Sequence, residues 1–521
     1  MSAIIKKIKL INFKRFENYE IEPNDKINIL VGDNEVGKSS ILEAIDIVAS
    51  GNLRRVESLG IDKLLNVKSV EKFNEGVREF RKLPKLIIEL YLEGDFDHTM
   101  NGKNNTDGRV CDGIRLVCEA NKDYFNEIKD ALDANDEYFP YDYYSIRFST
   151  FADEGYTGYK KKLRTIFIDS DNLNSEYATN DYIKRMYRQY TESDSKERAL
   201  HKSQLRQLKN GFRSTSLADL NARISGDKNY EFGLKLGSNS MFENELMIFE
   251  NDIGIDSKGA GTQVFIKTDF ALDRAGDNVD VILLEEPENH LSHTNLRKLI
   301  QRISESQEGQ MFITTHNSLI STRLELKNLL IMHIENNDSP LPLRNLSTDT
   351  AKYFMKAPAA NIIEFTISEK VILVEGPSEY ILLEKFYENI MHHKPEEDGV
   401  HIMDIRGLSF KRYLEIAKHL NNKVAVITDN DGDGNKNCVE KYTDFSNEQN
   451  IKIFYDLDDA KTTFEKVLFC ENEEWCIELF NDNALDFMLK NKTESAFNLI
   501  EKDVDINVPE YIKGAITWIN E

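Results

Sequence analysis

The chain has 521 residues and a formal net charge of −24, with 40% apolar and 30% charged residues. This length is sufficient for about three domains, and the composition is that of an ordinary folded protein. The negative charge argues against a protein that coats nucleic acid nonspecifically, but it does not exclude a nuclease that holds phosphate through metal ions and a local basic strip. The sequence contains no long apolar run and no apolar signal-peptide core, so we expect no membrane span and no secretion.

The five cysteines lack the spacing of a zinc site or a disulfide framework, which favours a reduced, cytoplasmic location.

At the N-terminus, KKIKLINF and DKINILVG predict strands, and a helical pattern follows from Lys38 to about residue 49. Between the second strand and this helix lies the pattern G-x-x-x-x-G-K-[ST]. Its glycines let backbone N–H groups surround phosphates, while the lysine reaches the β/γ-phosphates and the serine holds Mg²⁺. We therefore expect ATP to be bound by Gly32, Asn34, Gly37, Lys38, Ser39 and Ser40.

The region from about residue 95 to 245 is polar and rich in tyrosine, and it contains a long helical pattern from about residue 181 to 212. We interpret it as a helical insert that forms an arm or a dimerisation element. Residues 184–213 carry nine lysines and arginines against three acids. This strip is either a DNA-binding surface or a solvated helix face, and the pattern alone does not choose between them.

Two apolar strands are expected next, at DVILLEE and QMFITTH, with a helix at NLRKLIQRISES between them. The first strand delivers Glu285 and Glu286 to its C-terminal end. Beside a phosphate-binding loop, the first glutamate fits the Mg²⁺ shell and the second fits a group that orients or deprotonates the attacking water. His316 follows the second strand and is a candidate catalytic residue at the same edge.

The stretch ENNDSPLPLRNLSTDT reads as a linker. After it, strands and helices alternate again through KVILVEG, SEYILLEKFYENI, GVHIMDI, SFKRYLEIAKHL and KVAVITDND, which predicts parallel strands with helical crossovers. The chain is therefore predicted to be an α/β protein with two lobes.

In the second lobe, Glu375 ends one predicted strand, and Glu379 lies one helical turn later. The stretch DNDGDGNKNCVE follows another strand and includes Asp429 and Asp431. It also matches the calcium loop of an EF-hand, but that loop needs a preceding helix and an apolar residue where Lys436 stands. Acids at neighbouring strand ends would repel one another unless divalent cations neutralised them. We therefore expect Mg²⁺ or Mn²⁺, with two ions about 3.5–4 Å apart able to support phosphodiester cleavage.

These patterns resemble known families. LINFKRF, the phosphate-binding loop, SKGAGTQ, ILLEE and His316 resemble the ABC-type ATPase head of the SMC class. That resemblance implies a head-to-head homodimer in which Ser257, Gly259, Gly261 and Gln263 of one subunit close over the nucleotide of the other. The two acidic strand ends resemble the Toprim fold.

An ABC-type head followed by Toprim resembles the OLD (overcoming lysogenization defect) family of ATP-dependent endonucleases. The resemblance implies an ATPase domain over residues 1–350 and a Rossmann-like Toprim nuclease domain over residues 366–521. It also implies that Glu465 is a further metal ligand and that Lys513 neutralises charge on the cleaved phosphate.

The resulting expectation is a metal-dependent DNA endonuclease controlled by ATP, acting in bacterial anti-phage defence as a homodimer or tetramer. If the chain acts in defence, we expect a neighbouring defence protein, such as a helicase or a reverse transcriptase, as an additional partner. The alternative is an SMC-like, ATP-gated DNA clamp or sensor whose Toprim acids are inactive.

Overall fold

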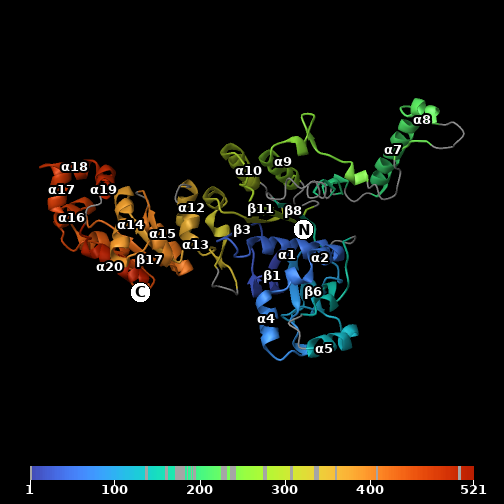
Figure 1. Cartoon of the computed structure of the whole chain (residues 1–521), viewed down its shortest axis with the longest axis horizontal. Helices are drawn as coiled ribbons and strands as arrows, with labels where there is room; N and C mark the ends of the chain where they lie inside the picture. The colour runs from blue at the N-terminus through green and yellow to red at the C-terminus, as the bar shows by residue number, and fades with distance from the viewer. Residues whose placement is uncertain are drawn as a thin grey trace. The chain divides into compact units, whose positions relative to one another are not determined.

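The computed structural model divides into two compact units (Figure 1). The first comprises Met1–Leu30, Asn34–His316 and Ile334–Pro340, and the second comprises Val31–Asp33, Asn317–His333 and Leu341–Glu521. The structure describes residues 3–134, 139–158, 162–169, 182–184, 186–188, 190–191, 195–224, 231–234, 242–273, 279–305, 309–333, 339–357, 361–406, 409–502 and 506–521. None of the helices within these ranges is long and apolar enough to cross a bilayer.

The first unit contains an antiparallel sheet in the order β2-β1-β4-β6-β5, with β7 also paired to β6. Ile8 and Leu10 of β1 are buried on either side of the less buried Lys9, and Ile114 and Leu116 of β6 flank Arg115 in the same way, as expected where one face of a sheet is covered. The strands are β1 (Ile4–Phe13), β2 (Phe16–Ile21), β4 (Leu86–Glu93), β5 (Asn101–Gly102), β6 (Cys111–Ala120) and β7 (Tyr144–Thr150).

A parallel sheet in the same unit carries the predicted ATPase motifs. Its strands run in the order β3-β12-β11-β8, and they are almost wholly apolar, as strands covered on both faces are. The strands are β3 (Ile27–Gly32), β8 (Thr165–Asp169), β11 (Val281–Glu285) and β12 (Gln310–Thr314). The helices that follow the motifs are α1 (Lys38–Ser50), α9 (Ala260–Leu272) and α10 (His293–Glu305).

The region from about residue 95 to 245 contains strands as well as helices, so it is not the purely helical insert that the sequence predicts. Its first half supplies β5, β6 and β7 to the antiparallel sheet and β8 to the parallel sheet. The later part contains α7 (Ser195–Ser214), a helix without a buried side chain, and α8 (Ala218–Ile224). Residues 170–181 and several other positions of the predicted arm lie outside the described residues.

Short elements complete the first unit. They are α2 (Leu53–Leu59), α3 (Ile61–Leu64), α4 (Val67–Glu75), α5 (Phe125–Asp133), β9 (Phe249–Glu250) and β10 (Ile253–Gly254), with 3-10 turns η1 (Phe80–Lys82), η2 (Lys122–Tyr124), η3 (Tyr141–Tyr143), η4 (Phe242–Asn244) and η5 (Ile255–Ser257).

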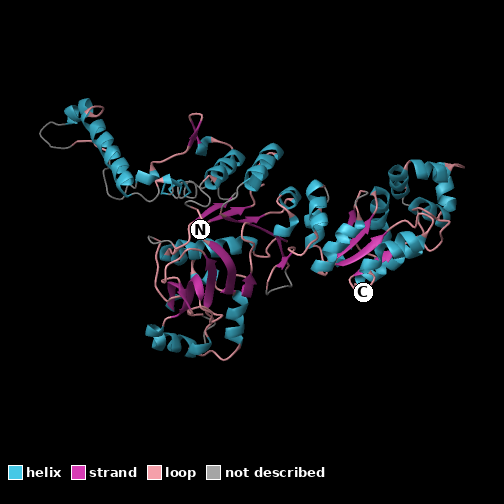
Figure 2. Ribbon diagram, turned by 180° about the vertical axis from the view of Figure 1, so that it is seen from behind, coloured by secondary structure: helices cyan, strands magenta, loops and turns pink. Residues whose placement is uncertain are grey.

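The second unit is built on a four-stranded parallel sheet in the order β16-β15-β17-β18, drawn in magenta in Figure 2. Ile372, Val374, Ala425 and Ile427 face one hydrophobic core with residues of α14 and α20. The strands are β15 (Lys370–Val374), β16 (Val400–Asp404), β17 (Lys423–Ile427) and β18 (Ile451–Phe454), and the helices between or after them include α14 (Pro377–Met391), α15 (Phe410–Leu420) and α20 (Glu510–Asn520). The predicted α/β architecture is thus confirmed.

Four helices between β18 and α20 form a cap at one end of the second unit. They are α16 (Phe464–Glu471), α17 (Glu473–Phe480), α18 (Ala484–Lys490) and α19 (Lys492–Glu501), and α19 packs against α14. The other elements of this unit are α11 (Ser318–Arg323), η6 (Leu326–Asn328), β13 (Leu329–Met332), β14 (Leu341–Pro342), α12 (Thr348–Lys356), α13 (Ile362–Ile367), η7 (Pro395–Asp398), η8 (Asn435–Val439) and η9 (Glu440–Phe445).

The stretch interpreted as a linker is partly ordered. Leu341 and Pro342 pair with β13 as strand β14, and the Ser347 side chain caps α12 by accepting from the Thr350 N–H. Within this stretch, a proline therefore lies in a short edge strand, and a serine caps a helix. Residues 335–338 of the stretch lie outside the described residues.

Candidate nucleotide and metal sites

The phosphate-binding loop ends at the N-terminus of α1, where Lys38 is the first helical residue and is buried. Gly37 has φ 97°, a left-handed conformation that glycine adopts without strain. A Cβ atom at Gly37 would overlap the Phe16 ring and crowd Arg15, so the loop packs tightly against the start of β2. Ser39 and Asn34 are exposed, and Ser40 is half-buried. The loop thus precedes the N-terminus of α1 directly, and a helix N-terminus is the part of such a motif that favours phosphate.

Glu285 and Glu286 lie at the C-terminal edge of the parallel sheet, as predicted. Glu285 pairs in register with Thr314 of β12, and the Glu286 N–H donates to the Thr314 carbonyl at 3.1 Å. The Glu286 carboxylate accepts from Asn289 Nδ2 at 2.9 Å, and its Oε1 lies 3.6 Å from His316 Nε2. The structure therefore brings Glu286 and His316 together.

Two acids at this edge were not singled out in the sequence. Glu288 is largely buried and accepts from the Thr315 hydroxyl at 2.6 Å and from the His316 N–H at 2.8 Å. Burial raises its pKa above the ordinary value. Asp169 ends β8 and pairs in register with Glu285. The Glu288 contacts fix the backbone that carries His316, and Asp169 adds a carboxylate beside the first glutamate.

The glycine-rich segment SKGAGTQ forms the N-terminal end of α9. Ser257 ends η5, and Gly259 is the N-cap of α9. A Cβ atom at Gly261 would overlap the His290 carbonyl oxygen, so this glycine permits close contact with the loop after Glu286. Gln263 is buried and donates to the Lys258 carbonyl at 2.9 Å, while its buried Oε1 has no hydrogen-bond partner among the described residues.

In the second unit, Glu375 follows β15 and Asp429 follows the adjacent parallel strand β17. Glu375 Oε1 accepts from the Thr428 hydroxyl at 2.6 Å and from the Asp429 N–H at 3.3 Å. Asp429 Oδ1 in turn accepts from the Phe464 N–H at 2.8 Å, at the start of α16. This last bond holds the N-terminus of α16, and with it Glu465, close to Asp429. The element before Asp429 is a strand, which confirms that DNDGDGNKNCVE does not follow an EF-hand helix.

Charge and burial couple four acids, which we call the acidic quartet: Glu375, Glu379, Asp429 and Glu465. Burial, and then the charges of the other three, raise the pKa of Asp429 to about 8. Burial and the charges of Glu465 and Glu375 raise the pKa of Glu379 to about 7. Lys492 opposes both shifts, and its Nζ lies 2.9 Å from Glu465 Oε2. Such mutual repulsion is what a bound cation would relieve.

The donor set fits a hard divalent cation. All four side chains offer carboxylate oxygens, which Mg²⁺ and Mn²⁺ prefer. Glu465 is only 2% exposed, and its buried Oε1 has no hydrogen-bond partner in the part of the chain that the structure describes. Within the described residues, however, no three His, Cys, Asp or Glu side chains stand close enough around one point to coordinate a metal. The four carboxylates of the quartet are therefore neighbours, but they are not arranged around a single point as the ligands of a bound ion would be.

Two predicted residues lie apart from the quartet's interactions. Asp431 is exposed with φ 49°, and its N–H donates to the Thr462 carbonyl at 3.2 Å. Lys513 lies on the exposed side of α20, 3.5 Å from the Glu510 carboxylate. Lys492, which the sequence did not single out, is the lysine that contacts the quartet. Only the fold packs α19 against α14 and so brings Lys492 to Glu465, which means that no local pattern could have identified this lysine.

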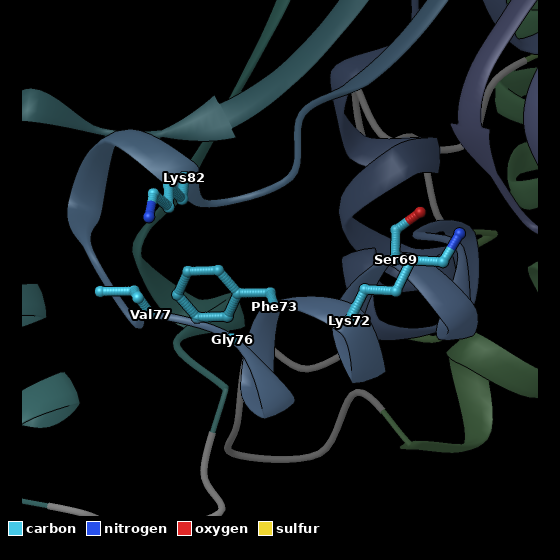
Figure 3. Close-up of a pocket in the computed structure, with 6 residues that line it drawn as sticks. All are labelled: Ser69, Lys72, Phe73, Gly76, Val77 and Lys82. Carbon is cyan, nitrogen blue, oxygen red and sulfur yellow. The ribbon is translucent and has the colours of Figure 1, made fainter.

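The basic strip is partly paired by the fold. Lys209 contacts Glu245 at 3.1 Å, Arg188 contacts Glu243 at 2.6 Å, and Arg213 is paired with Glu231. A pocket of about 380 Å³ lies elsewhere, on α4 and η1 of the first unit (Figure 3). It contains none of the predicted site residues and is lined by Ser69, Lys72, Phe73, Gly76, Val77 and Lys82.

Two protein families match the chain in separate segments. The family described as AAA ATPase domain matches residues 4–320, and the family described as overcoming lysogenization defect protein-like, TOPRIM domain, matches residues 367–431. The first match spans more than half of the chain and includes the phosphate-binding loop and both glutamates. The second includes Glu375, Glu379, Asp429 and Asp431.

Individual relatives are similar over shorter segments. The DNA replication and repair protein RecF of Clostridium kluyveri is 38% identical over 93 residues, which cover 17% of this chain and 24% of RecF. Endonuclease GajA of Bacillus cereus (strain VD045) is 25% identical over 158 residues, covering 30% of this chain and 27% of GajA. Among solved structures, the C-terminal region of the Xanthomonas campestris pv. campestris OLD protein is 17% identical, with a TM-score of 0.24, covering 29% of this chain and 94% of that region. The chain thus spans about a quarter of the length of these two curated relatives.

Proposed function

We propose that this chain, which belongs to the AAA ATPase domain family and is an OLD-family ATPase–Toprim fusion, is an ATP-controlled, metal-dependent DNA endonuclease. We assign the ATPase to residues 1–350 and the nuclease to residues 366–521. The observation that carries the proposal is the acidic quartet, in which burial and mutual repulsion raise the pKa of Asp429 to about 8. An acid cluster of this kind, at the carboxyl ends of neighbouring parallel strands, lies where α/β sheets bind ligands.

Glu375, Asp429 and Glu465 would hold Mg²⁺ or Mn²⁺, with Glu379 and the exposed Asp431 as further ligands. When bound, the metal would supply charge neutralisation at the phosphate and activation of water. The chain's own contribution is to hold the carboxylates in place. The Thr428 hydroxyl and the Asp429 N–H orient Glu375, and the Phe464 N–H orients Asp429. Lys513 remains a candidate for contact with the cleaved phosphate.

In the ATPase, Lys38 and the α1 N-terminus would bind the phosphates, with Gly32, Asn34, Gly37 and Ser40 completing the loop. Ser39 and Glu285 would hold the nucleotide's Mg²⁺. Glu286 would orient or deprotonate the attacking water, and its contacts with Asn289 and His316 support that role. In a homodimer or tetramer, Ser257, Gly259, Gly261 and Gln263 would close over the partner's nucleotide.

The biological setting follows from the family. GajA is named an endonuclease and RecF a DNA replication and repair protein, and together these names support a nuclease that acts on DNA. We propose a cytoplasmic role in bacterial anti-phage defence, in which ATP controls cutting. A neighbouring defence protein, such as a helicase or a reverse transcriptase, would be an additional partner.

Cleavage of supercoiled plasmid tests the proposal. The full chain is incubated with Mg²⁺ or Mn²⁺, with and without ATP, beside Asp429→Ala and Lys38→Ala variants. We expect the wild type to cut the plasmid only when a metal ion is present, and Asp429→Ala to abolish this cutting. In Lys38→Ala, cutting should no longer respond to ATP. Cutting that survives Asp429→Ala would contradict the assignment of the nuclease site. A wild-type chain that binds DNA in an ATP-dependent manner but cuts under no condition would instead be the SMC-like clamp.

A further inference from the structure

Lys492 is the first residue of α19, and its side chain reaches into the acidic quartet from solvent. The side chain of Lys492 is 49% exposed, whereas that of Glu465 is 2% exposed, and the two meet at 2.9 Å. The lysine charge also acts on Asp429 and Glu379. Lys492 is therefore a cation held by the acidic quartet, not only the partner of a single acid.

The Lys492–Glu465 ion pair leaves Glu465 incompletely satisfied. Lys492 bonds only Oε2, and among the residues that the structure describes the buried Oε1 has no hydrogen-bond partner. A buried carboxylate oxygen without a partner costs free energy. The chain offers no second donor to this atom within the described residues, so the site has room for a further positive charge at Glu465.

We propose that the Lys492 ammonium is a resident counter-ion of the acidic quartet that competes with a divalent metal ion for Glu465 and so lowers the metal affinity of the site. This inference rests on the proposed function, because it takes the quartet to be the metal site. With the metal absent, Lys492 limits the repulsion among the acids. When a metal ion binds, it is repelled by the positive charge of Lys492. The metal and the lysine must then share the Glu465 carboxylate, or the lysine must release Oε2.

Electrostatics predict that the Lys492 ammonium weakens the binding of a metal ion to the quartet. A charge-assisted hydrogen bond is roughly twice as strong as a neutral one, and it must be weakened before Glu465 can give both oxygens to a metal. Like charges within a few ångströms also oppose one another strongly in a poorly solvated site. Removing the ammonium should therefore tighten metal binding by about tenfold. A lysine that serves only to stabilise the fold would have the opposite effect, because its loss would loosen the site.

Lys490 provides a matched control. It is an exposed lysine at the end of α18, two residues before Lys492 in the chain. Lys490→Met removes the same charge and the same length of side chain as Lys492→Met, from an exposed position on the preceding helix. Long-range effects of net charge on metal affinity are thereby separated from the direct contact with Glu465.

The experiment is a calorimetric titration of the full chain with Mn²⁺, without nucleotide or DNA. We expect Lys492→Met to bind Mn²⁺ about tenfold more tightly than the wild type, with Lys492→Arg and Lys490→Met close to the wild type. Thermal unfolding in EDTA should show a lower midpoint for Lys492→Met, which Mn²⁺ restores. Lys492→Gln serves as a second variant if Lys492→Met fails to fold.

The outcomes separate the two proposals. If the wild type binds Mn²⁺ and Glu465→Gln weakens that binding, but removal of Lys492 leaves it unchanged or weaker, the counter-ion inference is overturned and the metal site stands. If the wild type binds no Mn²⁺, or Glu465→Gln has no effect on binding, the metal site itself is wrong and the inference falls with it.

Discussion

Thr428 donates its hydroxyl to Glu375 Oε1 at 2.6 Å, and this bond joins the carboxyl ends of β17 and β15. The two residues lie 53 positions apart in the chain, and the parallel pairing of their strands brings them together. The bond restricts a glutamate that would otherwise rotate freely at a strand end. The acidic quartet thus owes part of its geometry to a neutral neighbour.

Substitution Thr428→Val should weaken the quartet without changing its charge. Valine has nearly the shape of threonine but cannot donate to Glu375. We expect unfolding to cost about 1 kcal/mol less and Mn²⁺ affinity to fall several-fold. Chemical denaturation and calorimetric Mn²⁺ titration measure the two effects. Thr428→Ser keeps the hydroxyl and should bind Mn²⁺ like the wild type; equal affinity in all three proteins would contradict this role for Thr428.

Asp429 makes the stability of the metal-free protein depend on pH. Its pKa rises from an ordinary 3.8 to about 8 in the fold, mainly because of burial. A raised carboxyl pKa favours the protonated fold, so this stabilising contribution is complete below about pH 4 and is lost as the pH rises through about 8. We expect the free energy of unfolding in EDTA to fall by roughly 1 kcal/mol or more across this window.

Two comparisons test the origin of this pH dependence. Asp429→Asn cannot ionise and should show a flatter profile in denaturant titrations from pH 5 to pH 9. Added Mg²⁺ should raise the thermal midpoint of the wild type more at pH 8.5 than at pH 5.5, because the metal binds the deprotonated acids. The assignment to Asp429 fails if the aspartate and asparagine proteins have the same slope.

Substitution Glu286→Gln should separate ATP binding from ATP hydrolysis. Glutamine keeps the size of the side chain and can still accept from Asn289, but it cannot take a proton from water. We expect hydrolysis to fall by about 100-fold or more while ATP binding persists. Phosphate release and equilibrium binding of labelled ATP measure the two. Lys38→Ala should lose binding itself, and unchanged hydrolysis in Glu286→Gln would remove this residue from the ATPase mechanism.

The two glycines of SKGAGTQ should respond differently to the same added methyl group. At Gly261 the Cβ atom would overlap the His290 carbonyl, whereas at Gly259 it would meet nothing within 4 Å. We expect Gly261→Ala to destabilise the first unit by about 1–3 kcal/mol, as overpacking of a tight contact does. Gly259→Ala should leave the unfolding midpoint unchanged. A midpoint for Gly261→Ala that matches the wild type would show that the contact relaxes without cost.

Much of each site could be predicted from the sequence because its residues stand at the ends of recognisable strands. Gly32–Ser39, Glu285, Glu375 and Asp429 all follow apolar runs, and parallel strands align their carboxyl ends at one edge. Glu465 could be placed only by family resemblance. The structure couples it to Asp429 through the bond from the Phe464 N–H.

Other features depended on contacts that no local pattern encodes. Lys492 of α19 meets Glu465 of α16 although 27 positions separate them, and β8 joins β11 although more than 100 residues separate these strands. The backbone of Asp431 adopts a positive φ that leaves its side chain exposed, which the alternation of acids in DNDGDG does not indicate. Secondary structure could thus be predicted where the periodicity of apolar residues was strong. The partners of individual side chains could not, because the tertiary fold determines them.

Anomalous X-ray scattering from crystals of the full chain grown with Mn²⁺ tests the central claim most directly. We predict a manganese peak within coordination distance of carboxylate oxygens from Glu375, Asp429 and Glu465, and its loss in Asp429→Asn crystals. Manganese bound only at the nucleotide site, with the three acids unliganded, would contradict the account.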